Sequence, residues 1–205
     1  MARCVIVSGG DFGPIGPLEK DDCILACDRG FAWCREAGVV PHLLLGDFDS
    51  LKPEEAGNLP MLRFPVEKDD TDTMLAVRWA AEHGFDEVRL FCALGGSLDH
   101  LLANLQTLHF AVKAGLKASA ADARTELRVL GPGEYRFEKR PGWKFSVLAL
   151  TDRVEGLTLR GSKYDGEDLT LTNSFPLGVG NDFQDDITLS FRSGTAAVLL
   201  CNREM

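Results

Sequence analysis

Residues 43–50 read Leu43-Leu44-Leu45-Gly46-Asp47-Phe48-Asp49-Ser50, three apolar residues that lead directly into a short loop with two aspartates. The apolar run predicts a buried strand, and the glycine and aspartates predict a turn after it. Two carboxylates at positions i and i+2 of an extended loop point the same way and repel each other, so a cation is expected between them. Oxygen ligands on a short loop favour Mg²⁺, which usually takes one or two carboxylates together with substrate phosphates and water.

The first two thirds of the chain alternate short apolar runs with helical patterns, which predicts a parallel β-sheet covered by helices. Strands are predicted at residues 5–7, 24–26, 43–45, 62–64 and 88–93. Helices are predicted at 31–37 and 73–83, and each ends beside a glycine suited to a helix C-cap. A third helix is indicated by an apolar stripe made of Leu101, Leu105, Leu108 and Val112, which stops at Gly115.

Beyond about residue 124 the spacing of apolar residues changes from helical to alternating, as in residues 157–159 and 187–192. Turn sequences such as Gly131-Pro132-Gly133 separate these runs. The pattern predicts an α/β domain over residues 1–123 and an antiparallel β domain over residues 124–205. Residues 127–130 could belong to either part.

Charge and cysteine content narrow the function classes. The formal net charge of -9, from 31 acidic and 22 basic side chains, argues against nucleic-acid binding because the surface repels phosphate backbones. The six cysteines form no C-x-x-C pair of the kind that binds zinc. The N-terminal apolar run is too short for a signal peptide and no stretch is long enough to cross a bilayer, so we expect a cytoplasmic protein without a membrane partner.

Aspartates follow four of the predicted strands, where an open α/β sheet places its ligand crevice. They are Asp28, the pair Asp47 and Asp49, the group Asp69, Asp70 and Asp72, and Asp99. Any one of them could be a turn or helix-capping residue without a chemical role. Spacing does not choose among the three in the third group, and Lys68 beside them could neutralise either the carboxylates or a phosphate.

Two glycine-rich loops have different expected roles. Residues 95–100, Gly95-Gly96-Ser97-Leu98-Asp99-His100, join a strand to a helix and could bring backbone N–H groups against a phosphate. The signal is weak, because the loop lacks the Lys-Ser/Thr of a P-loop and the spacing of a dinucleotide fingerprint. Residues 10–17 contain prolines that lack N–H donors, so they are interpreted as a structural loop or a lid.

Four motifs taken together and in order resemble those of the thiamine pyrophosphokinases. They are Cys27-Asp28-Arg29-Gly30, Gly46-Asp47-Phe48-Asp49-Ser50, Asp70-Thr71-Asp72-Thr73, and Gly95-Gly96-Ser97-Leu98-Asp99-His100 with Asn104. Members of this family transfer diphosphate from ATP to the hydroxyethyl group of thiamine and release AMP. The resemblance implies an N-terminal α/β catalytic domain, a C-terminal β-sandwich, and a homodimer that binds thiamine where its subunits meet.

The resemblance also implies residue roles by motif position. Asp47, Asp49 and Asp72 would hold Mg²⁺, while Asp28 and Asp99 would complete the acidic catalytic site. Contacts to ATP would come from Arg29, Lys68, Gly95, Gly96, Asp99 and the region of His100. Residues 178–183 are similar to the family's thiamine-side loop, which assigns Asn181 and Phe183 to thiamine, although Phe183 is equally well explained as a core residue of the β domain.

The chain departs from the family pattern at two positions. Ser97 stands where many relatives have an arginine, so a cationic phosphate contact is absent or is supplied by Arg29 or Lys68. Gly180 stands where a serine is usual. Two other functions remain open, a metal-dependent nucleotide-sugar transferase with an Asp-x-Asp element and a non-catalytic ligand-binding sensor. Neither of them predicts AMP formation that depends on thiamine.

Overall fold

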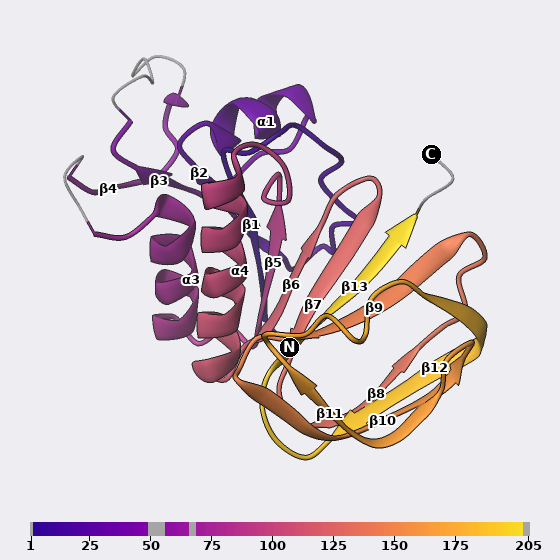
Figure 1. Cartoon of the computed structure of the whole chain (residues 1–205). Coiled ribbons are helices and arrows are strands. Elements are labelled where there is room, and N and C mark those ends of the chain that lie inside the picture. Colours follow the sequence, from indigo (N-terminus) through magenta and orange to yellow (C-terminus); the bar gives the residue numbers. More distant parts are fainter. Residues whose placement is uncertain (1, 49–55, 66–68, 203–205) are drawn as a thin grey trace. The chain divides into compact units, whose positions relative to one another are not determined.

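The computed structural model describes residues 2–48, 56–65 and 69–202 of the chain (Figure 1). It divides into two compact units, residues 1–123 and residues 124–205. Most of the regular structure is β-sheet, and the few helices lie in the first unit. None of the helices in the described ranges is both long and apolar enough to span a bilayer.

The first unit is built on a parallel sheet. Its strands are β1 (Arg3–Val7), β2 (Cys23–Cys27), β3 (Leu43–Gly46), β4 (Met61–Arg63), β5 (Glu87–Phe91) and β6 (Lys117–Ala121). Their order is β4-β3-β2-β1-β5-β6, with every neighbouring pair parallel. The five predicted strands are confirmed to within two residues at each end. The sixth, β6, was not predicted, because its sequence Lys-Ala-Ser-Ala-Ala has little β-branched or aromatic content.

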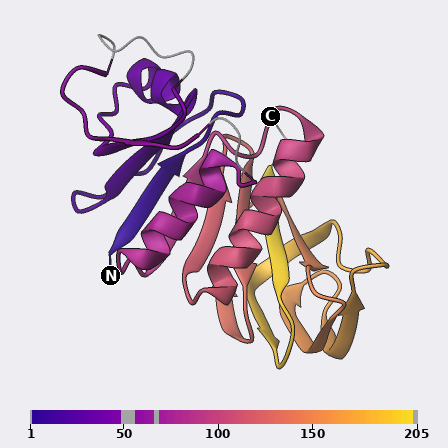
Figure 2. The ribbon, with the colours of Figure 1, turned by 90° about the vertical axis from the view of Figure 1, so that its left-hand side faces the viewer.

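Helices cover both faces of this sheet. On one face, α1 (Gly30–Glu36) packs Phe31 and Cys34 against Val5 and Val7 of β1. Side chains alternate along a strand, so the remaining side chains of β1 point to the opposite face, where α3 (Asp72–Glu82) and α4 (Leu98–Lys113) lie side by side (Figure 2). All three helices end before glycines with positive φ, namely Gly38 (68°), Gly84 (76°) and Gly115 (90°), which confirms the predicted C-terminal boundaries.

The buried face of α4 differs from the predicted stripe. The residues that are fully buried are Asn104, Thr107, Leu108 and Ala111, and only Leu108 belongs to the predicted set. The other members of the stripe, Leu101, Leu105 and Val112, are half-buried. Small side chains allow the helix to approach the sheet closely, and Asn104 satisfies its amide by donating to the carbonyl of Ala93 at 2.8 Å.

The strand order places a topological switch point beside β1. From β1 the chain moves outward through β2, β3 and β4, and it then returns to the other side of β1 to form β5 and β6. The loops after β1 and β5 therefore leave the sheet next to each other. In open α/β sheets a ligand crevice forms at the carboxyl ends of the strands at such a point.

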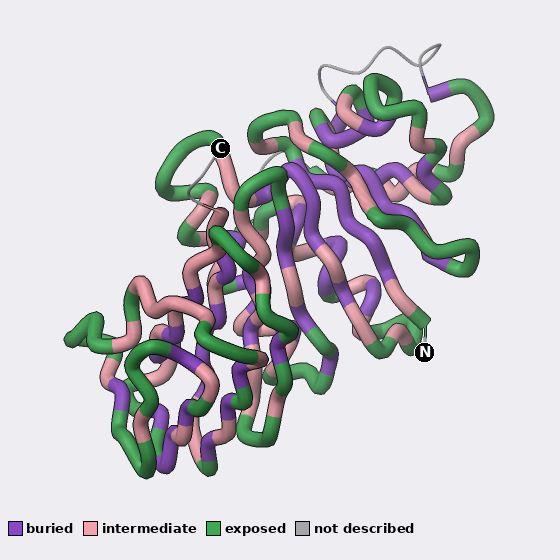
Figure 3. The backbone as a smooth tube through the Cα atoms, turned by 90° about the vertical axis from the view of Figure 1, so that its right-hand side faces the viewer, coloured by how far each residue is buried: buried purple, intermediate pink, exposed green. Residues whose placement is uncertain are grey.

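The second unit consists of antiparallel strands. They are β7 (Thr125–Leu130), β8 (Gly133–Phe137), β9 (Trp143–Ala149), β10 (Arg153–Ser162), β11 (Gly166–Thr172), β12 (Asn181–Phe191) and β13 (Ala196–Asn202). Strands β7, β13 and β9 pair in that order, and β12 pairs with β8, β10 and, at its first two residues, β9. Buried and exposed residues alternate along these strands, as the alternating sequence pattern predicts (Figure 3).

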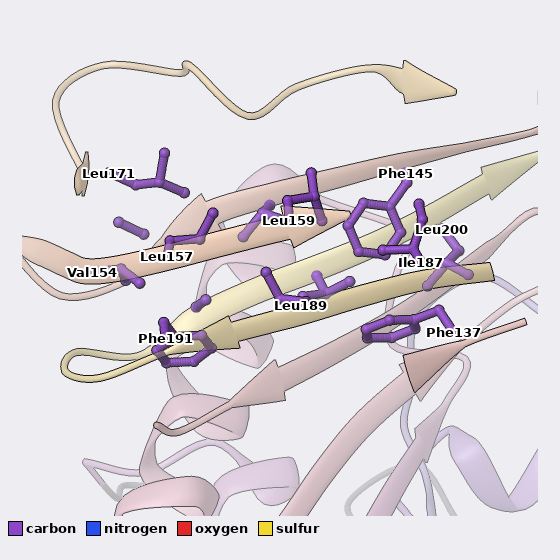
Figure 4. Close-up of a cluster of buried hydrophobic side chains, with 14 residues drawn as sticks. Phe137, Phe145, Val154, Leu157, Leu159, Leu171, Ile187, Leu189, Phe191 and Leu200 are labelled. Carbon is purple, nitrogen blue, oxygen red and sulfur yellow. The ribbon is translucent and has the colours of Figure 1, made fainter. Parts of the chain in front are cut away.

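A cluster of fourteen buried apolar residues forms the core of this unit, and β8, β9, β10, β12 and β13 all contribute to it (Figure 4). Phe137 and Phe145 meet edge to face, with ring centroids 5.1 Å apart. Phe183 packs on the margin of the same cluster and is half-buried. Burying an aliphatic or aromatic side chain stabilises a fold by about 1.5–3 kcal/mol, so this core holds the unit together.

Candidate active site

A cavity of about 480 Å³ lies at the carboxyl ends of β1, β2 and β5 and at the N-terminal ends of α3 and α4. Its position is the one that the switch point beside β1 predicts. It is lined by Ser8, Gly9, Gly10, Asp11, Cys27, Asp28, Arg29, Asp70, Thr71, Asp72, Thr73, Gly95, Gly96, Ser97, His100 and Asn104. Three of these are carboxylates from loops after β1, β2 and β4, and a fourth is Asp72 in the first turn of α3.

The backbone of two loops fixes the position of Asp28. Asp28 follows β2 with a φ of 42°, and its N–H donates to the carbonyl of Leu45 at 3.1 Å. Its carboxylate lies directly against Gly46, where an added Cβ would be 1.8 Å from Asp28 Oδ1. Gly46 has a φ of 154°, which an L side chain rarely adopts. Glycine at position 46 therefore leaves the space that the Asp28 carboxylate occupies.

Two other aspartates, from separate parts of the sequence, act on the Asp28 carboxyl group. Burial raises the pKa of Asp28 to about 7, helped by a hydrogen bond and charge from Asp72 and by the charge of Asp47, while the N–H of Phe48 acts in the opposite direction. Asp28 Oδ1 is buried and has no hydrogen-bond partner among the described residues. A cluster of mutually repelling carboxylates with an unsatisfied buried oxygen is suited to a cation.

The start of α3 is held by side-chain hydrogen bonds. Thr71 Oγ1 accepts from the N–H of Met74 at 3.2 Å, which caps the helix. The hydroxyls of Thr73 and Ser8 lie 2.9 Å apart in a buried contact, so α3 is tied to the end of β1. Asp70 pairs with Arg78 at 2.7 Å. That ion pair gives Asp70 a structural partner, whereas Asp72 points its charge toward Asp28.

The opposite wall of the cavity is formed by close-packed glycine backbone. The N–H of Gly96 donates to Asp11 Oδ2 at 2.9 Å, and the N–H of Gly10 donates to the carbonyl of Cys92 at 2.9 Å. A Cβ on Gly10 would lie 2.5 Å from that carbonyl oxygen, and a Cβ on Gly95 would lie 2.5 Å from Asp11 Oδ2. No side chain fits at Gly10 or Gly95, so the loops after β1 and β5 pack directly against each other, with the Asp11 carboxylate between them.

Most of the residues assigned from sequence lie around this cavity. Asp28, Arg29, Asp72, Gly95, Gly96 and His100 line it, and the charge of Asp47 acts on Asp28 from beside it. Asp99 is exposed and does not belong to the lining. Its pKa is lowered by hydrogen bonds from the Ser97 hydroxyl and from the N–H of His100, whose nitrogen is 2.9 Å from Asp99 Oδ1. Asp49 and Lys68 lie outside the described residues.

The two residues assigned to thiamine lie in the second unit. The Asn181 side chain donates to Ser162 Oγ and to the carbonyl of Tyr164, both at 3.0 Å, and accepts from the N–H of Tyr164 at 3.0 Å. Phe183 meets Phe145 edge to face at 5.7 Å. Phe183 also lines a cavity of about 260 Å³ that includes Trp143. Within this chain Asn181 therefore holds a turn, and Phe183 has both a core contact and a cavity contact.

Sequence reasoning missed the contribution of the first strand. Ser8, Gly9, Gly10 and Asp11 line the cavity, although residues 10–17 were interpreted only as a structural loop or a lid. The prolines of that loop begin at Pro14, and the residues before them retain their N–H groups. The position of Gly9 and Gly10 directly after an apolar strand was the signal that could have identified this wall.

No set of three or more His, Cys, Asp or Glu side chains that could hold a metal ion is present among the described residues. Mg²⁺ does not require such a set, because it usually binds one or two carboxylates and completes its coordination with phosphates and water. The donor chemistry at Asp28, Asp47 and Asp72 fits a cation of this kind.

The raised pKa of Asp28 predicts that Asp28→Asn stabilises the ligand-free protein at high pH. The folded state holds the Asp28 proton up to about pH 7, whereas the ordinary pKa is 3.8. The free energy of unfolding of the wild type should therefore fall as the pH rises from 4 to 7, and the variant should avoid this loss. After allowance for the partial exposure of Asp28, we expect a gain of about 1–2 kcal/mol at pH 8 relative to pH 4. Urea unfolding in the presence of a chelator measures this gain. If Asp28→Asn changes the free energy of unfolding by the same amount at pH 4 and at pH 8, the raised pKa of Asp28 is contradicted.

Comparisons with known proteins agree on one family. Residues 17–119 match the family model described as "Thiamin pyrophosphokinase, catalytic domain". The chain is 32% identical over 205 residues to the thiamine pyrophosphokinase of Bacillus subtilis, covering 95% of this chain and 96% of that protein.

Solved structures give the same result. The thiamine pyrophosphokinase of B. subtilis superimposes with a TM-score of 0.89 at 29% identity, covering 98% of this chain and 99% of that chain. A thiamin pyrophosphokinase family protein from Enterococcus faecalis gives 0.84 at 31% identity, covering 99% and 100%. Together with the cavity and its clustered aspartates, these likenesses show that the chain belongs to the thiamine pyrophosphokinase family.

Proposed function

We propose that this protein is an ATP-dependent diphosphotransferase that converts thiamine to thiamine diphosphate and releases AMP. The observation that carries the proposal is the meeting of Asp28, Asp47 and Asp72 beside a cavity whose opposite wall is glycine backbone. One side suits a cation and the other suits phosphate oxygens. The chain belongs to the thiamine pyrophosphokinases, and their reaction is the one that we propose for this site.

Mg²⁺ is the cation that we propose for the acidic side. Asp47 and Asp72 would hold the ion, and the family motif adds Asp49 to them. The Asp28 carboxylate would interact with the charge of the same ion. Bound there, the ion would neutralise phosphate oxygens of ATP, which is a large part of what phosphoryl-group transfer requires. Because Asp28, Asp47 and Asp72 already repel one another in the folded protein, the ion would relieve that repulsion when it binds.

The remaining residues of the cavity would position the reactants. Arg29 contributes a guanidinium to the wall, in a protein that has Ser97 where many relatives have arginine. Gly95 and Gly96 line the cavity without side chains of their own, and the phosphate chain would lie along them. The thiamine hydroxyl must attack the β-phosphorus of ATP for AMP to leave, so holding that phosphorus in line with the hydroxyl is the main task of these groups.

AMP release tests the proposal. Purified protein with ATP and Mg²⁺ should form AMP only when thiamine is added, and thiamine diphosphate should appear in equal amount. AMP formation without thiamine, or transfer from a nucleotide sugar, would contradict it. Ligand binding without any turnover would favour a sensor.

We further propose that residues 124–205 form a β-sandwich that binds thiamine and brings two chains together, while residues 1–123 bind ATP and Mg²⁺. The loop before β12 exposes three large apolar side chains, Phe175 at 64%, Leu177 at 55% and Val179 at 55%, which supports a protein partner. We expect sedimentation to give about twice the 22.4 kDa of one chain. A fully active species of 22.4 kDa at the assay concentration would refute the dimer.

A cytoplasmic location is also proposed. All six cysteines are free thiols, and four of them are buried. Free buried thiols are typical of proteins that fold in a reducing compartment.

Replacement of Phe183 tests the thiamine side of the site. If its ring covers the cationic ring of thiamine, Phe183→Ala should weaken thiamine binding by about 1–2 kcal/mol and leave ATP binding unchanged. Phe183→Leu is the matched variant, because it keeps apolar volume against Phe145 but has no aromatic face. Calorimetric titration of both variants with each ligand measures the effect. Recovery of thiamine affinity in Phe183→Leu would show that Phe183 acts only through packing.

A further inference from the structure

Trp33 contacts two residues of the cavity wall, Gly10 and Arg29. The residue is half-buried on α1 and is not one of the described residues that line the cavity. Its indole N–H donates to the carbonyl of Gly10 at 2.9 Å. Arg29 lies one helical turn earlier, and its guanidinium carbon is 4.7 Å from the centroid of the Trp33 ring. Both Gly10 and Arg29 line the cavity.

The loop of residues 9–12, which Trp33 contacts at Gly10, is held at several points. The N–H of Gly10 is bound by the carbonyl of Cys92, and Asp11 is bound by the N–H of Gly96. Phe12 packs on Trp33 with ring centroids 5.4 Å apart. A Cβ on Gly9 would lie 3.3 Å from the Cβ of Arg29, so the loop and Arg29 are already in close contact. Trp33 is the side chain that touches both.

A guanidinium on a surface would ordinarily sample many rotamers, because arginine has a long and flexible stem. A ring face within about 6 Å attracts the cation and limits the positions it adopts. The same side chain donates its N–H to the carbonyl of Gly10, so Trp33 links the position of the cation to that of the glycine wall. That distance determines whether both can contact one phosphate chain.

We infer that Trp33 is a positioning residue, which holds Arg29 and the loop of residues 9–12 in the arrangement that binds the triphosphate of ATP. The inference rests on the proposed function in taking ATP as the ligand. Trp33 itself is not among the described residues that line the cavity. Its effect is transmitted through the Arg29 cation on one side and the carbonyl of Gly10 on the other.

Two substitutions separate the two contacts of Trp33. Trp33→Phe keeps a ring face for Arg29 but loses the N–H that Gly10 accepts, whereas Trp33→Leu loses both. We expect the Kd for ATP to rise about threefold in Trp33→Phe, which loses only the hydrogen bond. It should rise about tenfold in Trp33→Leu, which loses the hydrogen bond and the cation–π contact. The Kd for thiamine should not change. Trp79→Leu on α3, whose ring stacks on His83 outside the cavity, is the matched control.

Inorganic tripolyphosphate is the deciding probe, with binding measured by calorimetry in the presence of Mg²⁺. If Trp33 acts through the phosphate contacts, Trp33→Leu should weaken tripolyphosphate and ATP by the same factor. In an Arg29→Ala background the effect of Trp33→Leu should shrink to the threefold effect of the loop contact. A loss for tripolyphosphate without a loss for thiamine is a result that a purely structural role would not give.

Three outcomes would overturn the inference. A loss for ATP with no loss for tripolyphosphate would mean that the ring contacts the base. Equal effects of Trp33→Leu with and without Arg29 would mean that the two residues are not coupled. Parallel losses for ATP, thiamine and thermal stability would indicate a packing residue. Because binding is measured without turnover, absence of AMP formation by the wild type would contradict only the proposed function.

Discussion

Asp47→Asn is expected to lower thiamine-dependent AMP release by about two to three orders of magnitude at limiting Mg²⁺, with little change in thermal stability. The substitution preserves the volume of the side chain but removes the charge that acts on Asp28. The loss of activity should also be partly reversed by a higher concentration of Mg²⁺, because a weakened ligand set still binds metal. The measurement is AMP release over a titration of Mg²⁺, with melting followed in parallel.

Asp21→Asn provides the control for this substitution. Asp21 is exposed and precedes β2, so it lies at the amino ends of the strands, away from the cavity. Asp21→Asn changes the net charge by the same amount as Asp47→Asn. We expect it to retain full activity. Near-wild-type activity of Asp47→Asn at limiting Mg²⁺ would contradict the assignment of Asp47 to the metal.

Gly46→Ala is expected to reduce activity by at least about a hundredfold and to destabilise the first unit by about 2–4 kcal/mol. The added methyl would lie 1.8 Å from Asp28 Oδ1 at a φ of 154°, so the carboxylate must leave its place among Asp47 and Asp72. Both the position of Asp28 and the backbone of the loop would change. Chemical denaturation and the AMP assay measure the two effects separately.

The control and the double variant identify the cause of the Gly46 effect. Gly38→Ala introduces a milder backbone constraint without a clash, with a φ of 68° and no atom within 4 Å of the added Cβ. It should cost about 1 kcal/mol and leave activity intact. Because the clash is with Asp28 itself, Gly46→Ala should destabilise the protein much less in an Asp28→Ala background. Equal destabilisation in both backgrounds would show that backbone strain alone is responsible.

The regular elements near the site could be predicted because local rules determine them. The apolar runs of β1, β2, β3 and β5 are short and bounded, and glycines mark the ends of the helices. The alanine-rich strand β6 could not be predicted, since its strand conformation comes from pairing with β5 and not from its own residue preferences.

The acidic residues of the cavity were easier to predict than its glycine wall. Aspartates at strand ends are visible in the sequence, and Asp28, Asp47 and Asp72 do come together. The glycine wall depends on a contact between residues 10–11 and residues 92–96, which are far apart in the chain. Motif position also could not foresee that Asp99 would accept hydrogen bonds from its own neighbours, or that Asn181 would hold the turn at Tyr164.

The central position of β1 has a consequence for how the protein is made. Residues 3–7 are synthesised well before residues 87–91 of β5, which form one of their two neighbouring strands. Until then an apolar strand has one open edge, the kind of surface that invites wrong pairing in a nascent chain. The glycine wall of the cavity needs the same late segment, so the cavity would be completed only after most of the first unit has been translated. A nascent chain shorter than this should neither bind nucleotide nor resist proteolysis in its first strand.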